Sequence, residues 1–105
     1  MENEDFGRTF NKLQELLASL TLTPEDDRVV LYQSIDPLLL TLEGELGKTA
    51  DASAFEKMNE LKVHLIALAR LDEPDGHTDD QHYRWAMTTL HDLRGSDAFA
   101  KAMSN

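Results

Sequence analysis

Apolar residues recur every three or four positions through most of the chain, which is the spacing of amphipathic helices rather than strands. The first run predicts a helix from Glu4 to about Leu20. Charged side chains such as Arg8 and Lys12 fall on its other faces. The apolar stripe that we expect to face the core is Phe6, Phe10, Leu13, Leu17 and Leu20.

A second helix is predicted to begin at Pro24, with Thr23 as its N-cap and the proline at the first helical position, where its missing N–H costs nothing. The three acids of residues 25–27 would then face the positive end of the helix dipole. Pro37 interrupts this helix, because an internal proline removes a backbone hydrogen bond and clashes with the preceding turn. We therefore expect the helix to be kinked or split at Pro37 before it ends near Gly47.

Three adjacent leucines, Leu38, Leu39 and Leu40, follow that proline. At 3.6 residues per turn they cover about 200° of the helix circumference, so one core cannot take all three. Either this half of the helix is enclosed on several sides, or one leucine belongs to a surface that contacts a partner.

A third helix is predicted to start between Asp51 and Ser53 and to reach about Leu71. Ser53 and Glu56 have the spacing of a capping box, in which two side chains satisfy backbone N–H groups at the helix start. Its expected apolar stripe is Phe55, Met58, Leu61, Leu65 and Leu68.

A fourth helix follows a loop that contains Pro74 and Gly76. Thr78 and Gln81 repeat the capping-box spacing at its start, and Arg94 before a glycine indicates its end. The side chains expected to face inward are Tyr83, Met87 and Leu90, with Ala86 and Leu93 beside them.

A short last helix is expected from Ser96–Asp97 to about Met103. No segment shows the alternation of a strand, and most predicted connections are short. The sequence thus predicts an all-α fold, an antiparallel bundle of four main helices with a short C-terminal helix. A chain of 105 residues can bury a core without disulfides or metal, so we predict a single helical-bundle domain over residues 1–105.

Twenty acidic against ten basic residues give the chain a formal net charge of -10. The bases are scattered singly, which disfavours binding to nucleic acid. The charge favours a basic protein partner, and it also keeps a small protein soluble without any partner. The absence of cysteine excludes disulfides and thiolate nucleophiles. The acidic N-terminus and the lack of a long apolar run disfavour a signal peptide or membrane span, so we expect a soluble cytoplasmic protein.

The largest local group of acids is residues 72–80, which hold five carboxylates and no Lys or Arg. An EF-hand alignment with Gly76 at the sixth position puts Leu71 at the first and His82 at the twelfth, so both anchoring calcium ligands are missing. A transition-metal site would use His77, Asp79 and His82, but carboxylate-bridged bundle sites also need a Glu-x-x-His motif on each of two helices. We therefore predict no metal and no cofactor.

Catalytic signatures are missing, because the chain has no nucleophile elbow, no glycine-rich phosphate loop and no His-Glu-x-x-His motif. Arg70 with His77, and Arg84 with His91, have an Arg-x6-His spacing that resembles that of helical ribonucleases of the HEPN type. The resemblance extends to two residues only, and the acidic composition opposes RNA binding. We predict no catalytic residues and expect Arg84 and His91 on the solvated face of the fourth helix.

Trp85 lies on a different face of the fourth helix from the inward stripe, together with His82, Thr89 and Asp92. Either the last helix or the connection at residues 21–23 covers this tryptophan, or it is an interface anchor with an acidic rim. Asp79 and Asp80 are mostly explained by the helix that they start, unlike the acids before them. The predicted partner-binding residues are Trp85, His82, Asp72, Glu73, Asp75, Asp79 and Asp80.

The sequence therefore favours a small acidic, non-enzymatic protein-binding module: an inhibitor or immunity protein, a chaperone or an adaptor that acts on a basic partner protein. One alternative is an acidic mimic that occupies a DNA- or RNA-binding groove, although most acids gather at helix starts, where capping explains them. A metal-dependent helical-bundle enzyme is less favoured. A homodimer through the leucine run or Trp85 is the remaining binding outcome.

Overall fold

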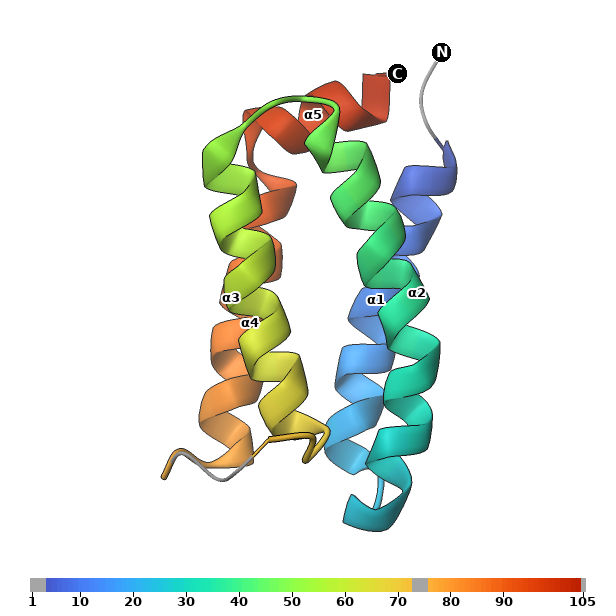
Figure 1. Ribbon diagram of the computed structural model, residues 1–105, viewed down its shortest axis with the longest axis vertical. Helices are drawn as coiled ribbons and strands as arrows, with labels where there is room; N and C mark the ends of the chain where they lie inside the picture. Colours follow the sequence, from blue (N-terminus) through green and yellow to red (C-terminus); the bar gives the residue numbers. More distant parts are fainter. Residues whose placement is uncertain (1–3, 73–75, 105) are drawn as a thin grey trace.

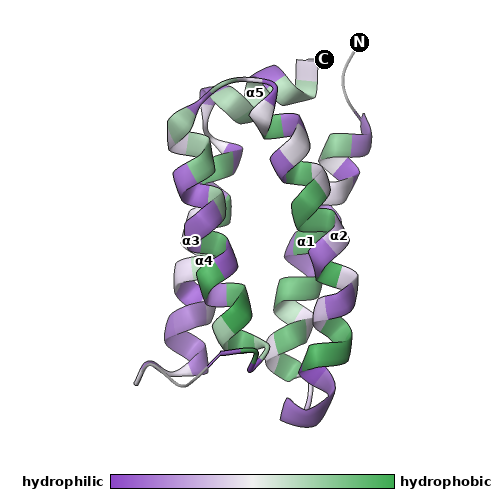
Figure 2. Ribbon diagram, viewed as in Figure 1, coloured by the Kyte–Doolittle hydropathy of each residue, from purple (hydrophilic) through white to green (hydrophobic). Residues whose placement is uncertain are grey.

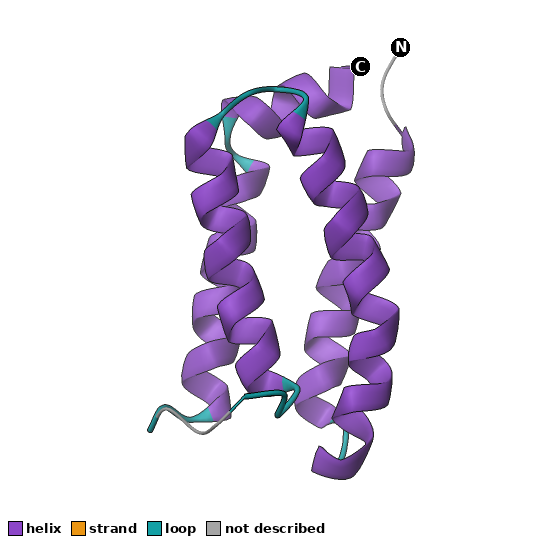
Figure 3. Ribbon diagram, viewed as in Figure 1, coloured by secondary structure: helices purple, strands orange, loops and turns teal. Residues whose placement is uncertain are grey.

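The computed structural model of the chain describes residues 4–72 and 76–104. These residues form helices joined by short connections and contain no strand, which confirms the predicted all-α bundle (Figure 3). None of the described helices is both long and apolar enough to cross a membrane. The elements are α1 (Glu4–Leu22), the 3-10 helix η1 (Glu25–Asp27), α2 (Arg28–Gly47), α3 (Ala52–Leu68), α4 (Asp79–Arg94) and α5 (Asp97–Ser104).

The four long helices run antiparallel, and α5 lies across one end of the bundle (Figure 1). α1 packs most extensively against α2, and α3 against α4, so the bundle consists of two helical hairpins placed side by side. The connections within both hairpins lie at the end opposite α5 (Figure 1). The C-terminal ends of α1 and α3 and the N-terminal ends of α2 and α4 therefore lie at the same end of the bundle.

The core lies between the hairpins, where hydrophobic positions of the four helices face one another (Figure 2). All five residues of the stripe predicted for α1 are buried. At the α5 end, the Phe99 ring packs 5.0 Å from Phe6 and 4.9 Å from Phe10, measured between ring centroids. Phe99 is partly buried, and Ala98 and Ala102 of the same helix are buried in the core, so apolar contacts hold α5 in place.

The predicted start of the second helix is wrong. Thr23 does not cap it, because its hydroxyl donates to the carbonyl of Ser19 at 2.7 Å. Residues Glu25–Asp27 instead form η1, and α2 begins at Arg28. The 3-10 turn brings the Arg28 side chain inside the molecule, where it is 7% exposed.

Pro37 does not split α2, which is a single helix from Arg28 to Gly47. Pro37 has no N–H to donate to the carbonyl of Gln33, four residues earlier. Both residues are exposed, so water can reach that carbonyl. Among the three leucines, Leu39 is buried, Leu38 is partly buried and Leu40 is 61% exposed. One leucine therefore lies on the surface, and its contact with a partner stays a prediction.

α3 begins at Ala52, within the predicted start, but it ends earlier than predicted. Its N-cap is Asp51, whose carboxylate accepts hydrogen bonds from the backbone N–H groups of Ser53 at 2.9 Å and Ala54 at 3.3 Å. The helix ends at Leu68, just before Arg70, which has the left-handed backbone angle φ of 63°. Ala54 is buried in the position expected for Phe55, whose ring remains 43% exposed.

α4 has the predicted boundaries, but its buried side is rotated from the predicted one. The capping box of Thr78 and Gln81 is present, and Gly95 follows the last residue. Tyr83 and Met87 are only partly buried, at the edge of the core. The buried residues of the helix are His82, Ala86, Thr89, Leu90 and Leu93, because α4 packs mainly against α3.

Candidate functional site

Three imidazole rings contact Trp85 where α3 meets α4, and we call these four side chains the Trp85 cluster. The ring centroids of His64, His77 and His82 lie 5.3, 4.8 and 5.6 Å from that of Trp85. His77 and His82 approach the indole edge-on, while the His64 ring is tilted by 36°. Trp85 remains 39% exposed. The indole is thus held from several sides and open to solvent on another.

His82 supports Trp85 from inside the protein. It is 3% exposed, and its Nδ1 atom lies 3.0 Å from the Nδ1 atom of His64. One of these nitrogens donates to the other, and the tautomers of the two rings decide which one. His82 was predicted to lie on the surface that contacts the partner. Because it is buried, it supports Trp85 from below instead. Thr89 is buried on the same side, with its hydroxyl donating to the Trp85 carbonyl at 2.9 Å.

The last helix and residues 21–23 are the segments that the sequence favours as a cover for Trp85. Its ring contacts come instead from α3 and from His77. The sequence could not place His64, because this contact depends on how α3 and α4 rotate against each other. The available signal is weak: His64 lies between Leu61 and Leu68 on one side of α3, next to its buried stripe.

A second polar group, centred on Arg28, joins the hairpins at the end opposite α5. The Arg28 guanidinium donates to the carbonyls of Thr23 at 2.9 Å, Leu68 at 3.0 Å and Thr21 at 3.4 Å, and to the Asp79 carboxylate at 2.9 Å. It therefore satisfies carbonyls at the ends of α1 and α3, which lack partners within their own helices.

Asp79 is held by two guanidinium groups. Arg70 donates to both oxygens of its carboxylate, at 2.7 and 3.0 Å, and also to Glu25 at 2.7 Å. These bonds hold the pKa of Asp79 below its usual value, and the bonds from Arg70 contribute more than the bond from Arg28. Burial opposes the shift. In turn, Asp79 and Glu25 raise the pKa of Arg70. We call Arg28, Arg70, Asp79 and Glu25 the Arg28 clamp.

The remaining predicted acids divide into paired, exposed and undescribed ones. Asp80 pairs with Arg84 at 3.0 Å on the exposed side of α4. Asp72 is exposed. Glu73 and Asp75 lie outside the described residues. Asp79 and Asp80 thus have structural partners of their own.

The histidines and acids do not form a metal site in the described part of the chain, where no group of three such residues is arranged to hold an ion. The carboxylate of Asp79, one of the three residues considered for such a site, is bound by Arg28 and Arg70. Its charge is therefore already compensated.

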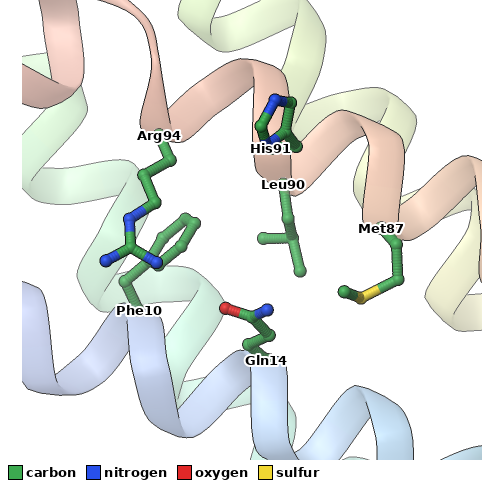
Figure 4. A pocket seen from close by; sticks show the side chains of 6 residues that line it. All are labelled: Phe10, Gln14, Met87, Leu90, His91 and Arg94. Atoms are coloured by element: carbon green, nitrogen blue, oxygen red, sulfur yellow. The ribbon is translucent and has the colours of Figure 1, made fainter.

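Two neighbouring hollows lie between α1 and α4, and Figure 4 shows the smaller one, of about 100 Å³. Its lining residues are Phe10, Gln14, Met87, Leu90, His91 and Arg94. The Arg94 guanidinium lies 5.9 Å from the centroid of the Phe10 ring, a cation–π contact (Figure 4). The second hollow, of about 450 Å³, shares Gln14 and Met87.

The smaller hollow offers His91 but no hydroxyl or carboxylate among its described lining residues. Acid–base catalysis by a histidine requires a second group that orients it or receives a proton. Arg84, whose spacing to His91 resembled that of HEPN ribonucleases, pairs with Asp80 rather than lining this hollow.

Comparisons with known proteins do not assign the chain to a family. No protein-family model matches it, and no curated protein or solved structure matches it either.

Proposed function

We propose that the protein is a small acidic, non-enzymatic protein-binding module of the inhibitor, immunity, chaperone or adaptor kind, which acts on a basic partner protein in the cytoplasm. The observation that carries the proposal is the Trp85 cluster. Tryptophan is enriched among the few residues that dominate binding energy at interfaces. An indole already held by three imidazoles loses little conformational freedom on binding, so more of its contact energy appears as affinity.

The surroundings of Trp85 suit a basic partner. Glu60 is exposed one helical turn before His64, on the same side of α3. Asp92 is half exposed two turns after Trp85 and pairs with Lys57 at 3.6 Å. An apolar centre with a charged rim is the usual organisation of a protein interface. The net charge of -10 would also accelerate the encounter with a positively charged protein.

Structural uses of the acids favour protein binding over nucleic acid mimicry. Asp51 caps α3, Asp79 belongs to the Arg28 clamp, and Asp80 pairs with Arg84. A protein that mimics nucleic acid needs carboxylates spaced along one face like phosphates. Those carboxylates must also be available to the Lys and Arg side chains of the partner protein. The metal-dependent enzyme has no specific observation in its favour.

The test is affinity capture from an extract of the native organism, using the unmodified protein and the variants Trp85→Ala and Val63→Ala. Val63 is a matched control, because it is an exposed apolar residue on α3, 58% accessible. The captured protein is expected to be rich in Lys and Arg. Its affinity should fall at least about 30-fold in Trp85→Ala, the loss expected of a hot-spot residue, and remain unchanged in Val63→Ala.

The proposal fails if Trp85→Ala retains every specific partner at the original affinity. It also fails if the captured protein is acidic or binds equally well at high salt, because attraction between opposite exposed charges is screened by ions. Far-ultraviolet circular dichroism of each variant distinguishes loss of binding from loss of folding.

A further inference from the structure

A second unusual surface lies on α2, in the other hairpin from the Trp85 cluster. Its exposed residues, which we call the α2 face, are Val29, Val30, Gln33, Ser34, Asp36, Pro37, Leu40, Thr41 and Gly44. Asp36 is the one charged residue among them, whereas 29% of the whole chain is charged. By contrast, the exposed side of α1 carries the ion pairs Arg8–Glu4 and Lys12–Glu15. The α2 face thus differs from an ordinary solvated helix side.

Apolar residues occur on two sides of α2. The inner side is the buried row of Ile35, Leu39, Leu42 and Leu46. On the outer side, Val30 is 64% and Leu40 is 61% exposed. A helix that is apolar around most of its circumference is normally enclosed on every side. Within the described residues, the chain itself leaves the outer side of α2 open.

We propose that the α2 face is the interface of a homodimer, in which α2 packs antiparallel against α2 of a second copy around a twofold axis near Pro37. The charge of the α2 face favours a second copy of the chain over a basic partner. A basic partner gains little from a face with one carboxylate, and it would prefer the acidic surfaces elsewhere on the molecule. Two copies that each carry -10 repel each other unless they meet where few carboxylates are brought together.

The α2 face is complementary to itself under that symmetry. With the axis at Pro37, Val30 of one copy lies opposite Gly44 of the other, and Leu40 lies opposite Ser34. In these two pairs a large side chain faces a small one, and the twofold symmetry repeats each pair. Space is available at Gly44, because an added Cβ atom there would meet no other atom within 4 Å.

The size of the α2 face sets the expected strength of the dimer. Twenty residues of helix extend about 30 Å, and stable interfaces usually bury about 1,200–2,000 Å² in total. A single pair of helices lies at the lower end of that range. We therefore expect a reversible dimer with a dissociation constant in the micromolar range.

Sedimentation velocity from low to high micromolar concentration tests the dimer, with Leu40→Glu as the disrupting variant and Val63→Glu as the control. Both positions carry similarly exposed apolar side chains, 61% and 58%, so both variants should fold. The unmodified chain and Val63→Glu should approach twice the monomer mass, and Leu40→Glu should remain monomeric. A monomer at every concentration, or a Leu40→Glu variant that dimerises as well as the unmodified chain, overturns the proposal.

The dimer does not depend on the function proposed for Trp85, and the same variants separate the two ideas. Trp85→Ala should lose the basic partner but keep the dimer. Leu40→Glu should lose the dimer but keep the partner.

Cysteine cross-linking tests the position of the axis, because the natural chain has no cysteine. Under the proposed symmetry, Gln33 lies opposite Thr41 of the second copy. The double variant Gln33→Cys with Thr41→Cys should form a covalent dimer on oxidation, since within one helix the two positions are about 12 Å apart, too far for a disulfide. Neither single variant should cross-link. Cross-linking of Gln33→Cys alone would place the axis elsewhere and overturn this arrangement.

Discussion

Arg28 connects the two hairpins through one buried guanidinium. Its partners lie after α1, at the end of α3 and at the start of α4. Burying a cation is costly, and the cost is offset here because an acid and several carbonyls replace the lost water. Removing the arginine would leave those carbonyls and the Asp79 carboxylate without their buried donor.

Arg28→Ala is therefore expected to lower the free energy of unfolding by roughly 2–3 kcal/mol, because buried carbonyls lose their donor while Arg70 still pairs with Asp79. Arg84→Ala is the control, because the Arg84–Asp80 pair is exposed, with 77% and 66% of the side chains accessible. Its removal should cost less than about 1 kcal/mol. Urea denaturation of both variants measures the difference, and equal losses would contradict the assigned role of Arg28.

Ionised Asp79 should make the free energy of unfolding decrease as the pH falls into the acid range. Its pKa is lower in the folded protein than in the unfolded chain, so its ionised form stabilises the fold at neutral pH. That contribution is present above the unfolded pKa of about 4 and is lost as the pH falls through the lower folded value. Unfolding measured from neutral to strongly acidic pH should show a smaller acid-dependent loss in Asp79→Asn than in the unmodified chain. Parallel curves would refute this assignment.

The residue scale is also where sequence-based prediction was weakest. Arg28 lies seven residues before Ile35, in phase with the buried side of α2, so its inward position could have been inferred from the period. The contact between His64 and His82 could not, because it joins residues of separate helices at 3.0 Å. Such contacts depend on tertiary packing, which local spacing does not encode.

The helix ends differ in how their first N–H groups are satisfied. Thr78 accepts from the Gln81 N–H at 3.1 Å and so caps α4, while the Thr23 hydroxyl donates backwards to Ser19. Two threonines that look alike in sequence thus have different roles.

Thr78→Ala should destabilise the protein by about 1 kcal/mol, as loss of an N-cap usually does. Thr23→Ala should change stability by less than about 0.5 kcal/mol, the usual effect of a surface substitution. Thermal unfolding of the two variants, monitored by circular dichroism, distinguishes them. A larger loss in Thr23→Ala would mean that Thr23 caps the second helix after all.

Most helices could be predicted because an apolar period of 3.6 residues appears directly in the sequence. The error at Phe55 arose from a one-residue difference in the phase of the α3 stripe, where Ala54 is buried instead. A small alanine in the core gives a weaker signal than a phenylalanine beside it. The rotation of α4 was missed because His82 and Thr89 are polar residues that are buried against α3.

At the scale of the whole molecule, the two proposed interfaces lie in different hairpins and have opposite electrostatic character. The Trp85 cluster lies between α3 and α4, near exposed acids. The α2 face has a single charge and belongs to a chain that carries -10 in total.

Salt should therefore act on the two associations in opposite directions. Added sodium chloride screens the repulsion between two acidic copies, so the dimer should tighten. It also screens attraction to a basic partner, so that complex should weaken. Sedimentation for the dimer and titration calorimetry for the captured partner, each at low and high salt, measure both trends. A dimer that dissociates as salt increases would argue against the α2 face.

The two-hairpin arrangement implies an order of folding events. Contacts within α1–α2 and α3–α4 join neighbouring parts of the chain, so each hairpin closes a short loop and can form early. The bonds from Arg28 to Leu68 and Asp79 cannot form until the hairpins have docked, because α2 supplies the donor and the other hairpin supplies the acceptors. These bonds of the Arg28 clamp therefore belong to the late side of the folding barrier, where losing an interaction mainly accelerates unfolding. The clamp governs how long the folded molecule survives more than how quickly it forms.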